Sequence, residues 1–235
     1  MTYLEWPRRV AALGQFHVEL LERPELGRDD EHHVRRVLRA KVGEEVVVTN
    51  GRGSWALCQV RDGGIERVSE VSHDPVMPDT TLYLTPLKGE RAEWAVAKAT
   101  EVGVGRVVPL LSARMVVKFK GEARDKTLSR WRKIANEAAA QCRRTYDVVV
   151  GEPVHVADVP ESVAVADLTG SGDWSDVRSV AVGPEGGWAS EEWDQSRRRV
   201  GLGPTVLRAE TAAVLAATLM TFPAGGWGFT LESAK

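Results

Sequence analysis

Val182-Gly-Pro-Glu-Gly-Gly-Trp188 follows an apolar run at 179–182 and precedes Ser190-Glu-Glu, which predicts the start of a helix. A loop so rich in glycine lets the backbone approach a ligand closely, and open α/β sheets bind ligands at the carboxyl ends of their strands. The loop lacks the Gly-Lys-Ser/Thr of a phosphate-binding loop and the spacing of a dinucleotide-binding turn. By itself it indicates either a ligand site of another kind or a structural turn.

On both sides of this loop, short apolar runs alternate with segments of helical periodicity. Strands are predicted at 82–84, 107–111, 163–167, 179–182 and 206–208, and helices at 91–102, 128–141 and 212–220. Such alternation predicts an α/β fold with a mostly parallel sheet covered by helices on both faces.

The N-terminal part has a different pattern. Runs at 45–49, 55–60 and 65–71 are separated by Asn-Gly-Arg-Gly at 50–53 and by Gly-Gly at 63–64, which are hairpin signals. They predict a small antiparallel β domain or barrel. A segment with two prolines, 73–79, has no apolar periodicity and predicts the linker. We therefore expect a β domain over 1–74 and an α/β domain over 75–235.

Composition excludes several classes. With 235 residues, 43% of them hydrophobic, the chain can bury a substantial core. It has no secretory leader and no apolar run of the roughly 18 residues needed to cross a bilayer, so we expect a soluble cytoplasmic protein that is not associated with membranes. Cys58 and Cys142 have no metal-ligand spacing and are too few for a disulfide framework, so no metal is expected.

Charge is distributed unevenly along the chain. The net charge is −2, yet the segment 114–144 contains ten basic residues and three acidic ones. Clustered Lys and Arg can bind nucleic-acid phosphates, although a solvated basic helix is an equally good explanation of the charge alone.

A second motif follows the glycine-rich loop. Glu210 and Thr211 open an almost wholly apolar helix, where an acid and a hydroxyl suit the free N–H groups of the first turn. Arg208 is the last residue of the predicted strand at 206–208 and comes shortly before this helix. A buried arginine is costly unless it is paired, so we expect a partner in Glu210, Glu185 or an RNA phosphate.

These motifs together resemble the RsmE family, the 16S ribosomal RNA uridine N3-methyltransferases of the SPOUT superfamily. The resemblance rests on Gly-Pro-Glu-Gly-Gly-Trp at 183–188 and Leu-Gly-Pro-Thr-Val-Leu-Arg-Ala-Glu-Thr-Ala at 202–212. Matches continue upstream in Lys88–Trp94 with Lys98–Gly103, in Trp131–Arg144, and in His33–Arg39 with 50–53. Where the family tends to have Ser-Glu-Arg, this chain has Ser112-Ala113-Arg114, which removes an acid that would orient Arg114.

The resemblance implies an S-adenosylmethionine (SAM)-dependent methyltransferase with a PUA-like N-terminal domain, a C-terminal trefoil knot and a homodimeric assembly. Its partner would be 16S ribosomal RNA or the assembling small subunit. The implied cofactor-binding residues come from the loops and strand ends already described: Leu84, Thr85, Pro86, Asp167, Gly183, Pro184, Glu185, Gly186, Gly187, Leu202, Gly203, Leu207, Arg208 and Thr211.

Methylation of uracil N3 requires loss of its proton and stabilisation of the anion that develops on the carbonyls. Candidate residues are Arg144 or Arg208 for the anion, and Glu210 or Asp167 for the proton. The residues expected to contact RNA are basic side chains of both domains: His33, Arg35, Arg36, Arg39, Arg114, Lys118, Arg130, Lys133 and Arg143.

Three alternatives stay open. A non-catalytic RNA-binding protein could keep the fold, although it would have no need of a bare glycine-rich loop. A SPOUT methyltransferase could act on another RNA. A nucleotide-dependent dehydrogenase would need a dinucleotide fingerprint followed by an acid about twenty residues later, and the chain has neither.

Overall fold

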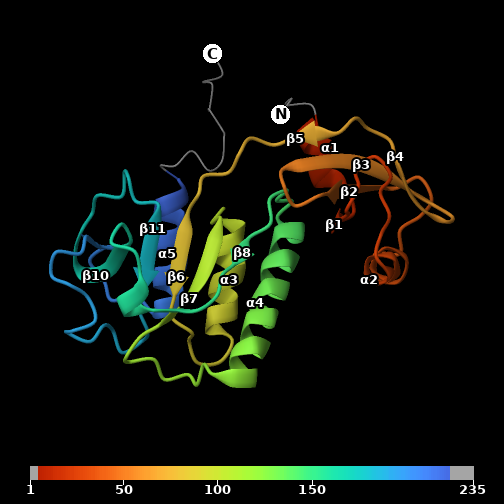
Figure 1. Cartoon of the computed structure of the whole chain (residues 1–235). Helices are drawn as coiled ribbons and strands as arrows, with labels where there is room; N and C mark the ends of the chain where they lie inside the picture. The colour runs from red at the N-terminus through yellow and green to blue at the C-terminus, as the bar shows by residue number, and fades with distance from the viewer. Residues whose placement is uncertain (1–4, 223–235) are drawn as a thin grey trace, which may run out of the picture. The chain divides into compact units, whose positions relative to one another are not determined.

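The structure, a computed structural model, describes residues 5–222, so the outer ends of both predicted domains, 1–4 and 223–235, lie outside it (Figure 1). The chain divides into two compact units. Unit 1 contains the residues up to Val76 together with Glu137–Asp147, and unit 2 contains Met77–Asn136 and the residues from Val148 onward. The end of one helix and the segment after it therefore belong to unit 1, a grouping that the sequence did not indicate.

Unit 1 is built on a β-sheet with strand order β1-β2-β3-β4 and with β5 beside β3. The predicted hairpins are confirmed, because β2, β3 and β4 pair antiparallel, whereas β1 pairs parallel to β2. The elements are α1 (Glu5–Ala11), β1 (Gln15–His17), α2 (Arg28–His32), the π-helical turn η1 (His33–Val37), β2 (Glu45–Thr49), β3 (Ser54–Arg61), β4 (Gly64–Arg67) and β5 (Ser72–His73).

Unit 2 contains the predicted parallel sheet, with strand order β12-β10-β11-β6-β7-β8 and with β9 beside β7. All of these pairings are parallel. Its elements are β6 (Thr81–Leu84), α3 (Arg91–Glu101), β7 (Arg106–Leu111), α4 (Gly121–Gln141, whose end belongs to unit 1), β8 (Val149–Val150), β9 (Val154–His155), the 3-10 turn η2 (Val156–Asp158), β10 (Ala164–Ser171), β11 (Ser179–Val182), β12 (Arg199–Val200) and α5 (Ala209–Thr221).

The two faces of this sheet are covered differently, which corrects the expectation of helices on both. Side chains alternate between the faces of a strand, and Leu82 and Leu84 of β6 join a core that includes residues of α3, α4 and α5. Tyr83 points to the other face, where the described core residues come from strands, loops and η2. Trp188 and Trp193 contribute the bulk there, with ring centroids 5.1 Å apart and planes perpendicular.

Two predicted elements do not form. No helix begins at Ser190, because residues 183–198 run through successive turns. In one of them the carboxylate of Asp194 accepts hydrogen bonds from the backbone N–H and hydroxyl of Ser196, a local pattern that competes with helix formation. The predicted strand at 206–208 is a loop with Val206 81% exposed. Its apolar residues suggested a buried strand, whereas the short strand β12 lies earlier, at Arg199–Val200.

None of the described helices combines the length and the apolar character needed to cross a membrane. Among residues 5–222, no three His, Cys, Asp or Glu side chains gather as metal ligands would. Both cysteines are free thiols, and burial raises the pKa of Cys58 to about 12.

Candidate cofactor and RNA sites

The carboxyl ends of β6 and β11 bring two of the predicted cofactor segments together. In the parallel register, Leu84 lies opposite Val182. The backbone N–H of Thr85 continues the pairing by donating to the carbonyl of Val182 at 3.2 Å. Residues 84–86 therefore begin beside the glycine-rich loop 183–187, at the edge of the sheet where α/β folds bind ligands.

Trp188 packs against the glycine-rich loop and explains one of its glycines. Its indole N–H donates to the carbonyl of Ala166 at 3.0 Å, which holds the ring across the loop. A Cβ at Gly183 would lie 3.0 Å from that ring, so the position has little room for any side chain. Gly187 has φ +66°, a conformation that side-chain-bearing residues rarely adopt. The loop is therefore shaped by packing as well as by any ligand.

Glu192 and Arg114 tie this loop to the segment that follows β7. The carboxylate of Glu192 accepts N–H groups from Ala113 at 2.6 Å and from Ala189 at 2.7 Å. Arg114 donates to the carbonyl of Gly186 at 3.1 Å. The family acid missing at position 113 therefore does not leave Arg114 without an orienting partner. Glu192 was not among the predicted site residues, because nothing in the sequence pairs it with a loop 79 positions away.

Arg91, at the start of α3, joins two other predicted segments. It donates to the carboxylate of Glu185 at 3.1 Å and lies 3.9 Å from that of Glu210. The ion-pair partners expected for Arg208 thus belong to Arg91 instead. Arg208 is exposed at the N-cap of α5 and makes no ion pair among the described residues, so the burial on which that expectation rested is absent.

The other predicted residues around α5 lie in the loop before it and in its first turn. Leu202 packs against the core, Gly203 has φ +115°, and Leu207 is half-buried. Thr211 is exposed in the first turn of α5. α5 lies in the same unit as the glycine-rich loop and packs against β6 and β11, the strands whose ends carry the predicted cofactor segments.

Three polar atoms near these strand ends are buried and have no hydrogen-bond partner in the described part of the chain: Thr85 Oγ1, Ser112 Oγ and Glu210 Oε2. Thr85 is fully buried and Ser112 is 9% exposed. Folded proteins satisfy nearly all buried polar groups, so an unpartnered one calls for a water, an ion or a ligand. Hydroxyl and carboxylate groups suit a ligand that carries amino, hydroxyl and carboxylate groups, as SAM does. The residues present therefore fit such a cofactor.

Asp167, in β10, is already occupied by protein groups. Its carboxylate accepts the N–H and hydroxyl of Thr169 and pairs with Arg199 at 2.7 Å. Burial acts to raise the pKa of Asp167, but the Thr169 hydrogen bonds and the Arg199 charge outweigh it and hold the pKa below its ordinary value. A carboxylate stabilised in this way is a poor proton acceptor, which favours Glu210 of the two candidates.

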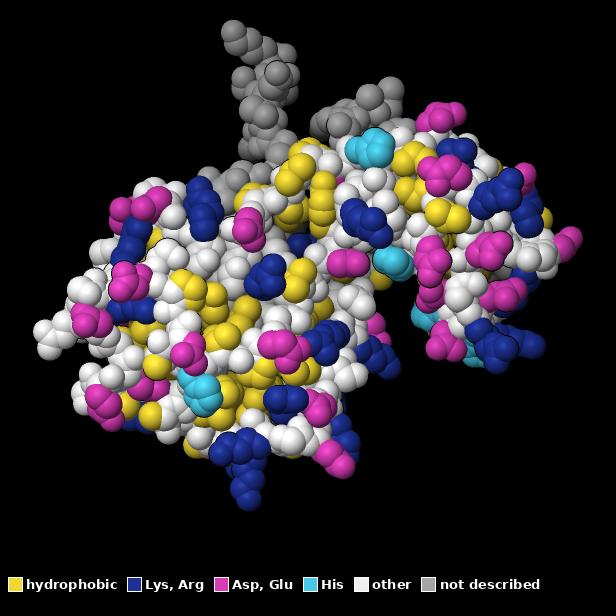
Figure 2. All heavy atoms as spheres, viewed as in Figure 1, with side chains coloured by type: hydrophobic (Ala, Val, Ile, Leu, Met, Phe, Trp, Pro, Cys, Tyr) yellow, Lys and Arg dark blue, Asp and Glu magenta, His cyan; other side chains and the backbone are white. Residues whose placement is uncertain are grey.

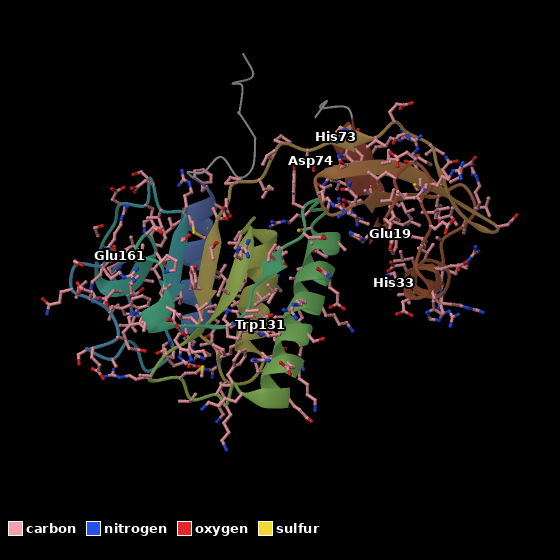
Figure 3. The ribbon with its side chains drawn as sticks, in the orientation of Figure 1. Glu19, His33, His73, Asp74, Trp131 and Glu161 are labelled. Carbon is pink, nitrogen blue, oxygen red and sulfur yellow. The ribbon has the colours of Figure 1, made fainter. Side chains whose placement is uncertain are left out.

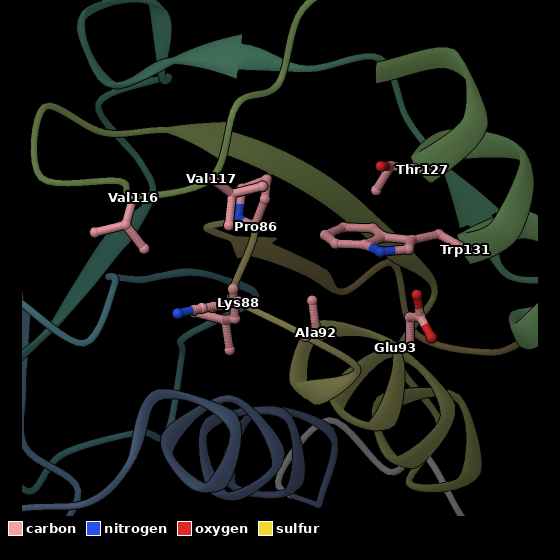
Figure 4. Close-up of a pocket in the computed structure, with 10 residues that line it drawn as sticks. Pro86, Lys88, Ala92, Glu93, Val116, Val117, Thr127 and Trp131 are labelled. Carbon is pink, nitrogen blue, oxygen red and sulfur yellow. The ribbon is translucent and has the colours of Figure 1, made fainter. Parts of the chain in front are cut away.

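A pocket of about 410 Å³ opens beside Pro86, between the start of α3 and the start of α4 (Figure 4). Trp131 and Thr127 line it from α4, and Ala92 and Glu93 line it from α3. The remaining lining residues are Leu87, Lys88, Gly89, Val116 and Val117. Only Pro86 also belongs to the predicted cofactor set, so the pocket adjoins that set without coinciding with it.

The basic segment 114–144 is partly neutralised within unit 2. Arg130 pairs with Glu93 at 2.7 Å and lies 3.7 Å from Glu90. Lys133 has an interaction of its own, whereas Lys118 is exposed and makes no ion pair within residues 5–222. Figure 2 shows Lys and Arg side chains over the loop between β7 and α4. Exposed ion pairs are weak, so phosphates could still compete for these cations.

In unit 1 the predicted RNA-binding residues His33, Arg35, Arg36 and Arg39 are all exposed on or beside η1. Arg35 pairs with Glu31 at 3.2 Å and donates to the carbonyl of Asp62. Arg36 and Arg39 make no ion pair among the described residues, which leaves both cations available.

Arg143 and Arg144 lie after α4 in unit 1 and are engaged with backbone carbonyls. Arg143 donates to Ala12 at 2.6 Å, and Arg144 donates to Tyr146 at 2.7 Å. Burial lowers the pKa of Arg144 to about 10, which still leaves it protonated at neutral pH. The contacts of Arg143 are those of a structural residue, and its predicted role in RNA binding stays a prediction.

Asp74, labelled in Figure 3, organises a polar network in unit 1. Both oxygens of its carboxylate accept a hydrogen bond from Arg9, at 2.8 and 3.0 Å. The carboxylate also accepts one from the Trp55 indole and one from the Thr145 hydroxyl. Arg9 is 2% exposed, also donates to the carbonyl of Arg143, and lies over the Trp55 ring. This network fixes the segment after α4 to the β domain.

Comparisons with known proteins agree with this architecture. Residues 74–221 match the model of an RNA methyltransferase domain, and residues 26–66 match that of an RNA methyltransferase PUA domain. The fold and the matched models thus define an RNA methyltransferase with a PUA domain before its α/β domain.

The ribosomal RNA small subunit methyltransferase E of Mycobacterium tuberculosis is 34% identical over 216 residues, covering 80% of this chain and 82% of that protein. The protein of the same name from Bacillus subtilis is 26% identical over 224 residues, covering 83% of this chain and 88% of its own. The chain belongs to the ribosomal RNA small subunit methyltransferase E family.

Solved structures support the same fold. A methyltransferase of Legionella pneumophila in complex with SAM aligns with a TM-score of 0.76 at 27% identity, covering 88% of this chain and 96% of that one. The family member of Neisseria gonorrhoeae bound to SAM, at 22% identity, aligns with a TM-score of 0.75 over 89% of this chain and 97% of its own. The trefoil knot implied by the sequence resemblance stays a prediction.

Proposed function

We propose that this protein transfers the methyl group of SAM to N3 of a uridine in 16S ribosomal RNA. The observation that carries the proposal is the set of unpartnered polar atoms of Thr85, Ser112 and Glu210 beside a glycine-rich loop at the carboxyl ends of parallel strands. Family membership supplies the reaction class. We further propose that the enzyme works as a homodimer in the cytoplasm, on RNA or on an assembling small subunit, with its domain boundary near residue 74.

The cofactor would be held by residues 84–86, by the glycine-rich loop 183–187 and by the segment 202–211. When bound, SAM supplies a methyl group already activated by its sulfonium. The chain must exclude water, position the uridine and manage one proton. The Trp188 ring and the Glu192 bridge fix the loops of this site before any ligand arrives, so the site is preorganised for the cofactor.

We assign Arg208 to stabilising the negative charge that develops on the uracil, and Glu210 to accepting the N3 proton. Arg208 is exposed and makes no ion pair with the described residues, so its guanidinium can approach a uracil carbonyl and stabilise the developing anion. Glu210 has one carboxylate oxygen near Arg91 and another, Oε2, with no donor, which suits the acceptor of the N3 proton. Arg144 is the alternative for the anion.

The target base must be unpaired or extruded, because N3 is hidden in a base pair. We place it toward the pocket beside Pro86, where Lys88 is exposed and makes no ion pair within the described chain. Arg36 and Arg39 of unit 1, with Lys118 of unit 2, would bind flanking phosphates.

The test is methylation of 16S RNA and of purified small subunits with labelled SAM, followed by digestion and identification of the modified nucleoside. We expect 3-methyluridine. Arg208→Ala should lower kcat by about 10²-fold or more, measured at saturating SAM so that any change in SAM affinity is separated from it. If Arg208→Ala is fully active and Arg144→Ala is not, the anion assignment moves to Arg144.

The outcomes also separate the alternatives. A modified nucleoside other than 3-methyluridine would contradict the proposed product, and activity on another RNA alone would contradict the proposed substrate. RNA binding with no SAM binding and no methyl transfer would favour a non-catalytic RNA-binding protein.

A further inference from the structure

Among the three unpartnered polar atoms near the cofactor segments, the Ser112 hydroxyl is the one that belongs neither to the predicted cofactor residues nor to the catalytic candidates. It follows the last residue of β7 directly, and it is 9% exposed. Its hydroxyl has no hydrogen-bond partner among residues 5–222. A hydroxyl that is withdrawn from water and left without a partner destabilises the fold, so its presence needs an explanation outside the fold.

The position of Ser112 is set by its neighbours. Ala113 donates its backbone N–H to Glu192, and Arg114 donates to the carbonyl of Gly186. Of the two residues after Ser112, Arg114 is thus bonded to the glycine-rich loop and Ala113 to the turn segment that follows it. Ser112 is thereby held beside the loop that the cofactor proposal uses.

Thr85, at the end of the adjacent strand, also has a buried hydroxyl without a partner among the described residues. β6 and β7 are neighbours in parallel register, with Leu84 opposite Pro109, so both strands end at the same edge of the sheet. Thr85, directly after β6, is fully buried and its hydroxyl is also unpartnered. Two such hydroxyls at adjoining strand ends are better explained by one polar ligand than by two separate defects of packing.

We propose that the Ser112 hydroxyl is a direct hydrogen-bonding contact of the bound SAM, which adds the segment after β7 to the cofactor site. This inference rests on the proposed function, since it takes SAM as the ligand. It predicts that removal of the hydroxyl changes SAM affinity and not stability. SAM binding becomes weaker, while the free protein stays at least as stable as the wild type, because no hydrogen bond among the described residues is lost.

The experiment is calorimetric titration of SAM into the wild-type protein and into Ser112→Ala, with urea unfolding of both proteins without ligand. We expect the Kd for SAM to rise about 3- to 10-fold, the range for one hydrogen bond, and the unfolding midpoint to stay unchanged or to rise. Ser175→Ala is the matched control, because the Ser175 hydroxyl already donates to Asp173 on the surface. Its Kd for SAM should equal that of the wild type.

Ser112→Cys keeps nearly the same volume with a weak hydrogen-bonding group and should weaken SAM binding to a similar extent. An unchanged Kd for both Ser112 variants, with wild-type binding intact, overturns this inference and leaves the proposed function standing. A change confined to the KM for RNA, or a large loss of stability in the free variants, also overturns it. Absence of SAM binding by the wild type would instead remove the proposed function itself.

Discussion

Two clusters of buried polar groups in this protein differ in how completely their hydrogen bonds are made. Around Asp74, in unit 1, both carboxylate oxygens accept hydrogen bonds from side chains of the protein: a guanidinium, an indole and a hydroxyl. At the carboxyl ends of β6 and β7, in unit 2, the hydroxyls of Thr85 and Ser112 have no partner. Asp74 is 18% exposed and the side chains that donate to it are buried, as Thr85 and Ser112 are, so exposure to solvent does not account for the difference.

The contrast separates structure from binding. The hydrogen bonds of the Asp74 carboxylate are already made in the free protein, and they stabilise the segment after α4. An open cluster keeps its hydrogen-bonding capacity for a molecule that is not part of the chain. Substitutions in the two clusters should therefore affect different quantities: the free energy of unfolding for the Asp74 network, and ligand affinity for the strand-end cluster.

Asp74→Ala should have the largest effect. It leaves the buried guanidinium of Arg9 without its bidentate partner, and breaking a buried ion pair costs about 3–5 kcal/mol of unfolding free energy. Urea denaturation measures this loss, and Asp62→Ala, an exposed acid of the same unit, is the control. A loss below about 1 kcal/mol would mean that the network contributes little to the fold.

Glu192→Gln should have an intermediate effect, and on binding. The amide can accept only one of the two N–H bonds now made from Ala113 and Ala189, so one connection between the loops is lost. We expect the Kd for SAM to rise about tenfold, with a smaller change in stability. Glu191→Gln is the matched control, because that exposed side chain accepts a hydrogen bond from the adjacent Ser190 and does not bridge Ala113 and Ala189. Equal affinities for the two variants would show that the bridge is dispensable.

Asp167→Asn should have the smallest effect, and it should depend on pH. The pKa of Asp167 is held below its ordinary value of 3.8, so the folded state favours the charged form. The stabilisation is fully present above the unfolded pKa and is lost as pH falls through the lower folded value. The stability difference from the wild type, about 1 kcal/mol or less at pH 7, should shrink below about pH 4. A difference that grows in acid would contradict the account.

The sequence predicted the parallel sheet, the hairpins of unit 1 and the glycine-rich loop, because periodicity and turn residues are local signals. It did not predict Arg91 or Glu192, whose partners are distant in the chain and are chosen by packing. The same limit explains the error over Arg208. The apolar residues beside it suggested burial, and only the fold shows that the loop 201–208 leaves Arg208 exposed.

Trp188 and Trp193 show a second limit. Their neighbours, Ser190-Glu-Glu, predict the start of a helix, and an α/β pattern predicts helices on both faces of the sheet. The two indoles instead cover one face from a segment of turns, with Arg197 lying 5.4 Å from the Trp193 ring centroid. Large side chains can cover a sheet from a segment without regular structure, and a local sequence pattern does not distinguish this arrangement from coverage by a helix.

Hydrogen exchange of backbone amides, measured with and without SAM, tests the contrast between the two clusters most directly. The account predicts that SAM slows exchange in residues 84–86, 112–114 and 183–192 and in the first turn of α5, while the segment 143–147 around Thr145 is already protected and does not change. Uniform protection across both clusters, or none in residues 112–114, would contradict the assignment of the strand-end cluster as the cofactor site.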